Sequence, residues 1–195
     1  MLYTQTVAPE TLELLKRLES EPFMDSFSLA GGTALALYLG HRVSVDLDLF
    51  TPESFDEKQL EFSLRHKYGF QTKFTAQHTL KGTIGGVKID CIAHRYKSLR
   101  PPHMESGLRL YDMEDIIAMK LAAISDDGSR LKDFIDMAFL STRFSLDSML
   151  RCFERKFPFS NVLGPVKGLL YFDDINFGEK VFILSLIHIS EPTRR

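Results

Sequence analysis

The stretch from Ser28 to Phe50, SLAGGTALALYLGHRVSVDLDLF, constrains the fold more than any other part of the chain. The letters FSLA around its start predict a short strand, and the residues from Val45 to Phe50 predict a second one. Between them, Thr33 to Leu39 predict a short helix that Gly40 closes, since glycine is common just past a helix end. A strand, a glycine turn, a helix and a strand in close succession indicate an α/β protein.

The segments on either side extend this pattern. Leucines at helical spacing predict a helix from Pro9 to Glu19, and a second helix is expected from Asp56 to Tyr68. Gly85 and Gly86 predict the two-residue turn of a hairpin. From Asp112 onward helical periodicity dominates and predicts helices in MEDIIAMKLAAIS, SRLKDFIDMAFLST, SLDSMLRCFERKF and NVLGPVKGLLYF. We therefore expect an α/β front, residues 1–100, followed by a helical part, residues 101–183.

Composition limits the classes of function. The 195 residues carry a formal net charge of -2, which gives no general attraction to nucleic acid or to anionic membrane. An RNA partner would need a local basic patch, for which Arg130, Lys132 and the segment from Arg151 to Lys156 are candidates. Cys91 and Cys152 do not make a disulfide framework, and the histidines lack zinc-ligand spacing. With no signal peptide or membrane-length apolar run in the sequence, we expect a soluble cytoplasmic protein without a membrane partner.

The end of the chain differs in kind from the rest. Residues 184–195, LSLIHISEPTRR, resemble translated sequencing-adapter read-through. We expect this tail to be artefactual and leave it out of the prediction of the fold. The alternative is a native amphipathic tail.

Asp46 and Asp48 lie two residues apart in the predicted strand VDLDL. Alternation along a strand sends Val45, Leu47 and Leu49 to one face and both carboxylates to the other, about 7 Å apart. Two like charges on one face repel each other unless water or a cation separates them. The pattern fits either a solvated strand face or a site for a divalent metal ion such as Mg²⁺ or Mn²⁺.

The double glycine and a later aspartate extend this site. Gly31 and Gly32 would let a polyphosphate approach the first N–H groups of the helix, and Thr33 could cap that helix or donate its hydroxyl. Simple chain reversal is the other interpretation of the turn. In VKIDCIA the apolar neighbours of Asp90 face away from it, as in the acidic strand. If the two strands are neighbours, three carboxylates meet as a two-metal site requires; otherwise Asp90 is an ordinary exposed strand residue.

Charged residues also interrupt the predicted helices. Lys120 shares a helix face with isoleucines, so its charge either reaches water along the stem or binds phosphate. Asp133 and Asp136 lie one turn apart beside Lys132 in an apolar segment, where buried charges should be paired. These residues fit either structural ion pairs or a functional site.

In this order, AGGTALALYLGHRVSVDLDLF and the later EDIIAMKLAAISDDGSRLKDFIDMAFL resemble the AbiEii/AbiGii toxin family, within the nucleotidyltransferases of the DNA polymerase β superfamily. The resemblance covers about residues 27–140 and, weakly, YFDDI. It implies a polymerase β-like α/β core with a mixed sheet, followed by a helical C-terminal part. It also implies a toxin that is encoded beside a cognate antitoxin and acts in phage defence or growth arrest. Related mycobacterial toxins add nucleotides to the 3′ ends of tRNA.

The resemblance assigns roles to particular residues. It implies that Asp46 and Asp48 hold the metal ions, that Asp90 holds one of them and takes the proton of the attacking hydroxyl, and that Gly31 to Thr33 grip the triphosphate. The family's R-x-S-x-D-L-D run places Arg42 and Ser44 near the phosphates, although a structural bond is the other interpretation of Arg42. Catalytic or nucleotide-binding roles are also implied for Lys120, Lys132, Asp133 and Asp136.

These expectations predict a metal-dependent nucleotidyltransferase that moves NMP from an NTP to the 3′ end of an RNA such as tRNA, releasing pyrophosphate. Two other functions stay open. One is a catalytically inactive nucleotide-binding or protein-interaction module on the same fold, and the other is phosphoryl transfer from GTP or ATP to a protein partner. The product from labelled nucleotide, pyrophosphate or nucleoside diphosphate, separates the two kinds of transfer.

Overall fold

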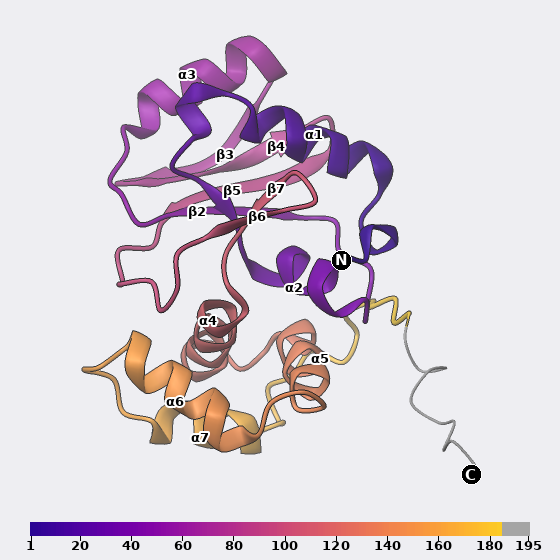
Figure 1. Ribbon diagram of the computed structural model, residues 1–195, viewed down its shortest axis with the longest axis vertical. Helices are drawn as coiled ribbons and strands as arrows, with labels where there is room; N and C mark the ends of the chain where they lie inside the picture. Colours follow the sequence, from indigo (N-terminus) through magenta and orange to yellow (C-terminus); the bar gives the residue numbers. More distant parts are fainter. Residues whose placement is uncertain (185–195) are drawn as a thin grey trace.

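The computed structural model describes residues 1–184, which form a mixed sheet with helices on both sides. The strands are β1 (Ser28–Leu29), β2 (Leu47–Thr51), β3 (Gln71–Ala76), β4 (Thr79–Ile84), β5 (Val87–Ala93), β6 (His103–Glu105) and β7 (Leu108–Leu110). The helices are α1 (Pro9–Glu19), α2 (Gly31–Leu39), α3 (Glu57–Tyr68), α4 (Met113–Asp126), α5 (Leu131–Leu140), α6 (Leu146–Lys156) and α7 (Leu163–Leu170). In Figure 1, α1 and α3 lie above the sheet, and α2 and the helical layer α4 to α7 lie below it.

The sheet brings the two acidic strands together. Its strand order is β3-β4-β5-β2-β1-β7-β6. β2 runs parallel to β5 and antiparallel to β1, and β1 runs parallel to β7, so the sheet is mixed as predicted. The register of β2 and β5 sets Asp48 directly beside Asp90. The condition for a shared carboxylate face is therefore met.

Alternation fixes which way these strands face. Leu47 and Leu49 of β2, and Ile89 and Cys91 of β5, are fully buried on the face opposite the two aspartates. Full burial of a leucine or isoleucine side chain contributes roughly 1.5–3 kcal/mol to stability. A one-residue slip of register would exchange the leucines for carboxylates in the core, so the apolar face fixes where Asp48 and Asp90 lie.

β2 begins at Leu47 and not at Val45, so the prediction for its first residues was wrong. Val45 is 54% exposed instead of joining the leucines in the core. Contacts outside the sheet hold this segment, because the Ser44 N–H donates to the Thr6 carbonyl at 2.9 Å and the Thr33 hydroxyl donates to the Asp46 carbonyl. Asp46 therefore lies at the entry to the strand.

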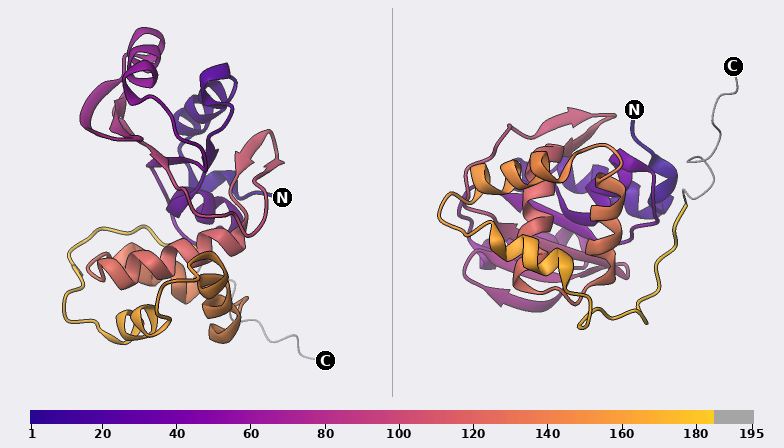
Figure 2. Two further views of the ribbon diagram at one scale, coloured as in Figure 1. Left: turned by 90° about the vertical axis from the view of Figure 1, so that its left-hand side faces the viewer. Right: turned by 90° about the horizontal axis from the view of Figure 1, so that it is seen from below.

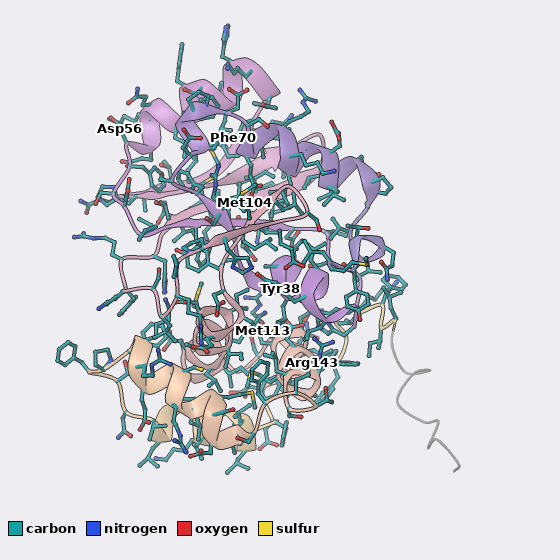
Figure 3. The ribbon with its side chains drawn as sticks, viewed as in Figure 1. Tyr38, Asp56, Phe70, Met104, Met113 and Arg143 are labelled. Carbon is teal, nitrogen blue, oxygen red and sulfur yellow. The ribbon has the colours of Figure 1, made fainter. Side chains whose placement is uncertain are left out.

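Other predicted elements are confirmed. The helices from Pro9 and near Asp56, the hairpin at Gly85 and Gly86, and the four C-terminal helices all form, and α2 starts at Gly31 instead of Thr33. The Asp56 carboxylate caps α3 by accepting the N–H groups of Lys58 and Gln59. Figure 3 shows Asp56 at the end of the molecule remote from α6 and α7.

Strands β3, β6 and β7 were not predicted. β3 is mostly exposed, so its sequence lacks the alternation that a half-buried strand shows. β6 and β7 have three residues each, too few to carry a pattern. Because β7 ends at Leu110, the sheet continues past residue 100, where the sequence suggested the helical part would begin.

After α7 the chain returns toward α2 and runs beside the helical layer (Figure 2). Ile183 bridges to Arg42, the Val43 N–H donates to the Phe182 carbonyl at 2.9 Å, and the Leu184 N–H donates to the His41 carbonyl at 2.8 Å. Residues 185–195 of the suspected tail lie outside the described residues. None of the helices in residues 1–184 has the length and apolar character needed to cross a membrane.

Candidate active site

A cavity of about 950 Å³ opens between the sheet and the helical layer. Asp48 and Asp90 line its sheet wall, together with Lys81 and Lys88 of the hairpin. The facing wall comes from α4 and from the segment between α6 and α7, and the glycine turn at the start of α2 closes one side. A volume of this size is at the upper end of the range for small-molecule and cofactor sites.

Asp48 and Asp90 are the acidic centre of this cavity. They occupy paired positions on neighbouring strands, and strands in a sheet lie about 4.8 Å apart. Burial, and then the neighbouring Asp90, raise the pKa of Asp48 above its usual value. Asp90 is 5% exposed, and its Oδ1 atom is buried without a hydrogen-bond partner among residues 1–184. The face therefore holds like charge that protein groups do not fully neutralise.

Asp46 stands beside this pair at the entry to β2. It is half-buried, and its charge contributes to the raised pKa of Asp48. Within the described residues no three His, Cys, Asp or Glu side chains gather closely enough to hold a metal ion by themselves. Mg²⁺ commonly binds one or two carboxylates and takes its other ligands from water and substrate phosphates. Two facing carboxylates with one unpaired oxygen fit such an ion, with the phosphates completing the shell.

The glycine turn is needed for close approach. Gly31 has a φ of +64°, and a Cβ atom there would lie 2.1 Å from Oδ2 of Asp48. A Cβ atom on Gly32 would lie 2.3 Å from an Nη2 atom of Arg42. Ala30 precedes α2 without a side-chain cap, so no capping side chain occupies the first N–H groups of this helix, and Gly31 and Gly32 line the cavity. The turn therefore does more than reverse the chain, because a side chain at either glycine would displace a charged group.

Thr33 and Ser44 lie behind the site. Both are buried, and their hydroxyls are 2.8 Å apart. Thr33 donates to the backbone of Asp46 and does not cap α2. The pair holds the segment that carries Asp46, so in this structure the two hydroxyls position the acidic strand.

Asp136 joins two cationic side chains and an imidazole in the interior. Its Oδ1 atom accepts from Nε2 of His41 and Nε of Arg42, each at 2.7 Å, and its Oδ2 atom accepts from Nη2 of Arg42 at 3.0 Å. Nζ of Lys120 lies 2.7 Å from the same Oδ2. Burial opposes ionisation, but Lys120, His41 and Arg42 together hold the pKa of Asp136 well below its usual value. Arg42 thus makes the structural bond that was one of its two interpretations.

Lys120 is bound to two carboxylates. Its Nζ atom donates to Oδ1 of Asp133 at 2.6 Å, in addition to its contact with Asp136. Burial disfavours its charge, but Asp136 and Asp133 raise the pKa of Lys120 above its usual value. Because the side chain is 9% exposed, its stem does not carry the charge out to water. Lys120 and Asp133 also line the cavity, so the ion pairs form the floor of the site.

Lys132 points elsewhere. Its Nζ atom lies 3.0 Å from Oε1 of Glu179, and the cavity is lined instead by its neighbours Arg130 and Asp133. Tyr171 follows α7 as its C-terminal cap, so YFDD marks a helix end. Lys156 was part of the predicted basic surface, but it is buried, and its Nζ atom lies 2.6 Å from Oδ1 of Asp115.

Two site residues escaped the sequence analysis. Nζ of Lys81 lies 3.4 Å from Oδ2 of Asp90, and Nζ of Lys88 lies 3.2 Å from the same atom. A signal was present, because Lys88 precedes Asp90 by two positions and the hairpin register pairs Lys81 with Asp90. Burial disfavours the charge of Lys88, but Asp90, and then Asp48 and Asp46, raise the pKa of this lysine.

Solved structures share this fold. A proposed nucleotidyltransferase from H. pylori matches 84% of this chain and 93% of its own, with a TM-score of 0.52 and 17% identity. The antibiotic-resistance factor ANT(2'')-Ia matches 80% of this chain and 92% of its own, with a TM-score of 0.55 and 17% identity. The fold is that of the polymerase β-like nucleotidyltransferases, as predicted.

The sequence narrows this class to a family. Residues 13–186 match the family described as nucleotidyl transferase AbiEii toxin, type IV TA system. An uncharacterized protein of Aquifex aeolicus, aq_aa25, is 34% identical over 178 residues, which is 85% of this chain and 82% of that protein. The chain belongs to the AbiEii family of toxin nucleotidyltransferases, and it is an NTP-dependent enzyme.

Proposed function

We propose that the protein transfers a nucleoside monophosphate from an NTP to the 3′ hydroxyl of an RNA, with tRNA as the preferred acceptor. The observation that carries this proposal is the pairing of Asp48 with Asp90 at the wall of a nucleotide-sized cavity. The activity belongs in the cytoplasm, where the acceptor is found, and a cognate antitoxin encoded nearby would restrain it, as membership of a toxin–antitoxin family implies.

Asp48 and Asp90, with Asp46 at the strand entry, would hold Mg²⁺ or Mn²⁺. Such ions offset the charge on the phosphates and favour the deprotonated form of the attacking hydroxyl. The chain's part in this is to supply hard oxygen donors on rigid strands. The incomplete pairing of Asp90 among residues 1–184 and the raised pKa of Asp48 support this role, since both are signs of negative charge that a bound cation would offset.

Side chains and backbone groups of the cavity would also serve the transfer step itself. The ribose 3′ oxygen forms a bond to the α-phosphorus, the bond from that phosphorus to the bridging oxygen breaks, and pyrophosphate leaves. One oxygen of Asp90 would hold a metal ion and the other would take the hydroxyl proton; its Oδ1 atom has no hydrogen-bond partner among residues 1–184. Gly31 and Gly32 would let the triphosphate approach the start of α2, where N–H groups and the helix dipole favour anions.

An RNA acceptor needs positive charge beside the cavity. Arg130 lines the cavity and is 58% exposed, with its Nε atom 3.7 Å from Oδ2 of Asp133. We assign the contact with the acceptor's phosphates to Arg130. Lys156 is excluded from this surface by its burial, and Lys132 pairs with Glu179. Binding of RNA should weaken as salt rises, because each phosphate contact releases counterions.

The test is incubation of the protein with each α-labelled NTP, Mg²⁺ and total small RNA. We expect the label to enter tRNA-sized RNA, pyrophosphate to be the other product, and a blocked RNA 3′ end to abolish labelling. Removal of the RNA 5′ phosphate is the matched control and should change nothing. Label transferred from γ-labelled NTP to protein would instead identify phosphoryl transfer. Binding of NTP without any transfer would identify an inactive module.

A further inference from the structure

The hairpin β4–β5 carries two lysines to the acidic centre of the cavity. From this placement we infer that Lys81 and Lys88 are a triphosphate-binding pair, which Asp90 holds until a divalent cation and an NTP arrive together. On arrival of the cation, Asp90 exchanges its two ammonium partners for the metal, and the lysines exchange Asp90 for phosphate oxygens. This inference deepens the proposed function and rests on its nucleotide site, but not on the identity of the acceptor.

The geometry places both charges at one atom. Lys81 comes from β4 and Lys88 from β5, yet their Nζ atoms lie 3.4 Å and 3.2 Å from the same Oδ2 of Asp90. The other oxygen of Asp90 has no partner among residues 1–184. A carboxylate built only to satisfy two lysines would spread them over both oxygens, since it has about four acceptor positions. The crowding on one side leaves the other side of Asp90 free for a second ligand.

Exposure also separates these contacts from structural ion pairs. The side chains of Lys81 and Lys88 are 37% and 48% exposed, and both line the cavity. Ion pairs to lysines that are this exposed contribute little to stability. The lysines can therefore leave Asp90 at small cost when another anion is offered.

Charge balance gives the order of events. Without ligands, Lys81 and Lys88 offset only part of the charge of Asp46, Asp48 and Asp90, and a divalent cation that enters alone meets two ammonium groups beside the carboxylates. An NTP brings about four negative charges in its triphosphate at neutral pH. Two divalent cations and one NTP together add almost no net charge, and cation and NTP should each raise the affinity for the other by the same factor, as linkage requires.

Phosphates of the NTP fit this position better than the RNA backbone. Lys81 and Lys88 lie at the acids themselves, whereas Arg130 lies on the helical side of the cavity. The metal-binding end of such a site is where triphosphate oxygens complete the metal shell. The experiment nevertheless separates the two sources of phosphate.

The test compares Lys81→Met and Lys88→Met with the parent protein and with Lys73→Met, an exposed lysine on the neighbouring strand β3. Methionine keeps the apolar stem and removes the charge. Two affinities are measured without any turnover. One is for Mn²⁺ alone, followed by the spectroscopic signal of free Mn²⁺, and the other is for the Mn²⁺ complex of α,β-methylene-ATP, with the GTP, CTP and UTP analogues in parallel.

The expected changes have opposite signs. Each lysine variant should bind Mn²⁺ alone more tightly than the parent, because a competing positive charge has gone. Each should bind the nucleotide complex about tenfold more weakly, the effect of losing one charge-assisted contact. Lys73→Met should change neither affinity, Lys88→Arg should restore nucleotide binding, and AMP binding should be unaffected.

Unchanged affinity for the nucleotide complex in both variants would overturn the inference. So would weaker binding of tRNA with unchanged nucleotide binding, which would assign the lysines to the acceptor. If the parent protein never labels RNA but the two opposite shifts are observed, the acceptor proposal fails and the triphosphate pair stands. A thermal unfolding midpoint equal to that of Lys73→Met shows that each variant is folded.

Discussion

Two clusters of aspartates and cations lie on opposite walls of the same cavity, and they differ in how completely their charges are paired. On the helical wall, both oxygens of Asp136 are bonded, and its partners His41, Arg42 and Lys120 are all buried. Asp133, which shares Lys120 with Asp136, is less completely paired, because its Oδ2 atom has no hydrogen-bond partner among residues 1–184 and lies 3.7 Å from Nε of Arg130. On the sheet wall, Asp90 has one oxygen near two lysines and one oxygen without a partner among residues 1–184, and Asp48 lies beside it with the same charge.

The difference separates a structural network from a binding face. A buried carboxylate with every acceptor position used has nothing to offer a ligand, and its value lies in joining the loop at Arg42 to α4 and α5. Adjacent carboxylates with an unpaired oxygen carry a cost that a cation removes. We therefore assign a positioning role to the helical cluster and the proposed chemistry to the sheet cluster.

The largest expected effect is on the sheet wall. Asp48→Asn should reduce nucleotide transfer about a thousandfold, the scale of losing a group that stabilises charge in the transition state. The fold should stay intact, because removing a like charge relieves repulsion with Asp90. Activity is measured by label incorporation from α-labelled NTP, and Asp46→Asn should behave in the same way.

Asp174→Asn, at an exposed position near the C-terminal end, is the control and should keep full activity. Mg²⁺ or Mn²⁺ should raise the unfolding temperature of the parent and of Asp174→Asn, but much less that of Asp48→Asn. Equal stabilisation of all three by metal would refute the assignment of Asp48 as a ligand.

The next effect is on the helical wall and should appear as lost stability. Asp136→Asn keeps the shape but leaves the Arg42 and Lys120 charges buried with poorer partners. Breaking one side of a buried ion pair typically costs about 3–5 kcal/mol. Urea unfolding measures the loss. Glu179→Gln, which removes the partly exposed pair with Lys132, should cost less than about 1 kcal/mol. Similar losses in the two variants would contradict a special role for Asp136.

The two glycines of the turn contact different walls, so alanine substitutions at Gly31 and Gly32 test the sheet wall and the helical wall separately. Gly31→Ala places a Cβ atom against Asp48 at a positive φ, so it should impair transfer as well as stability. Gly32→Ala places its Cβ atom against Arg42 of the buried network and should cost about 1–3 kcal/mol. After correction for the folded fraction, Gly32→Ala should retain more activity than Gly31→Ala. The reverse order would place the phosphate contact at Gly32.

Sequence patterns predicted which residues of Leu47 to Leu49 and of VKIDCIA face the core, because alternation along a strand depends only on local geometry. They placed Val45 wrongly and missed Lys81 and Lys88 of the same wall. The pairing of Asp48 with Asp90 needed one further condition, that the two strands be neighbours, and the structure meets it. The partners of Lys120 could not be predicted in this way. Its contact with Asp133 and Asp136 depends on how α4 packs against α5, and the bonds of Arg42 join a loop to a helix far along the chain. Such long-range pairings leave no local pattern.

The smallest expected effect is on the pH dependence of stability, which should have opposite signs for Asp136 and Asp48. The pKa of Asp136 is lowered by its cationic partners, so its stabilising contribution is complete above the unfolded-state pKa of about 4 and declines below it. The pKa of Asp48 is raised by burial and by Asp90, so its ionised form costs stability near neutral pH, and this cost disappears as the pH falls toward about 4.

In metal-free buffer, Asp48→Asn should therefore unfold at a higher temperature than the parent near neutral pH, and the advantage should shrink on acidification. The deficit of Asp136→Asn should stay constant over that range and narrow only below about pH 4. Thermal unfolding with a chelator at a series of pH values measures both differences. If the difference in unfolding temperature between Asp48→Asn and the parent does not change with pH, the ionised Asp48 carboxylate does not destabilise the fold. The contrast between the two walls would then rest only on how their hydrogen bonds and ion pairs are arranged.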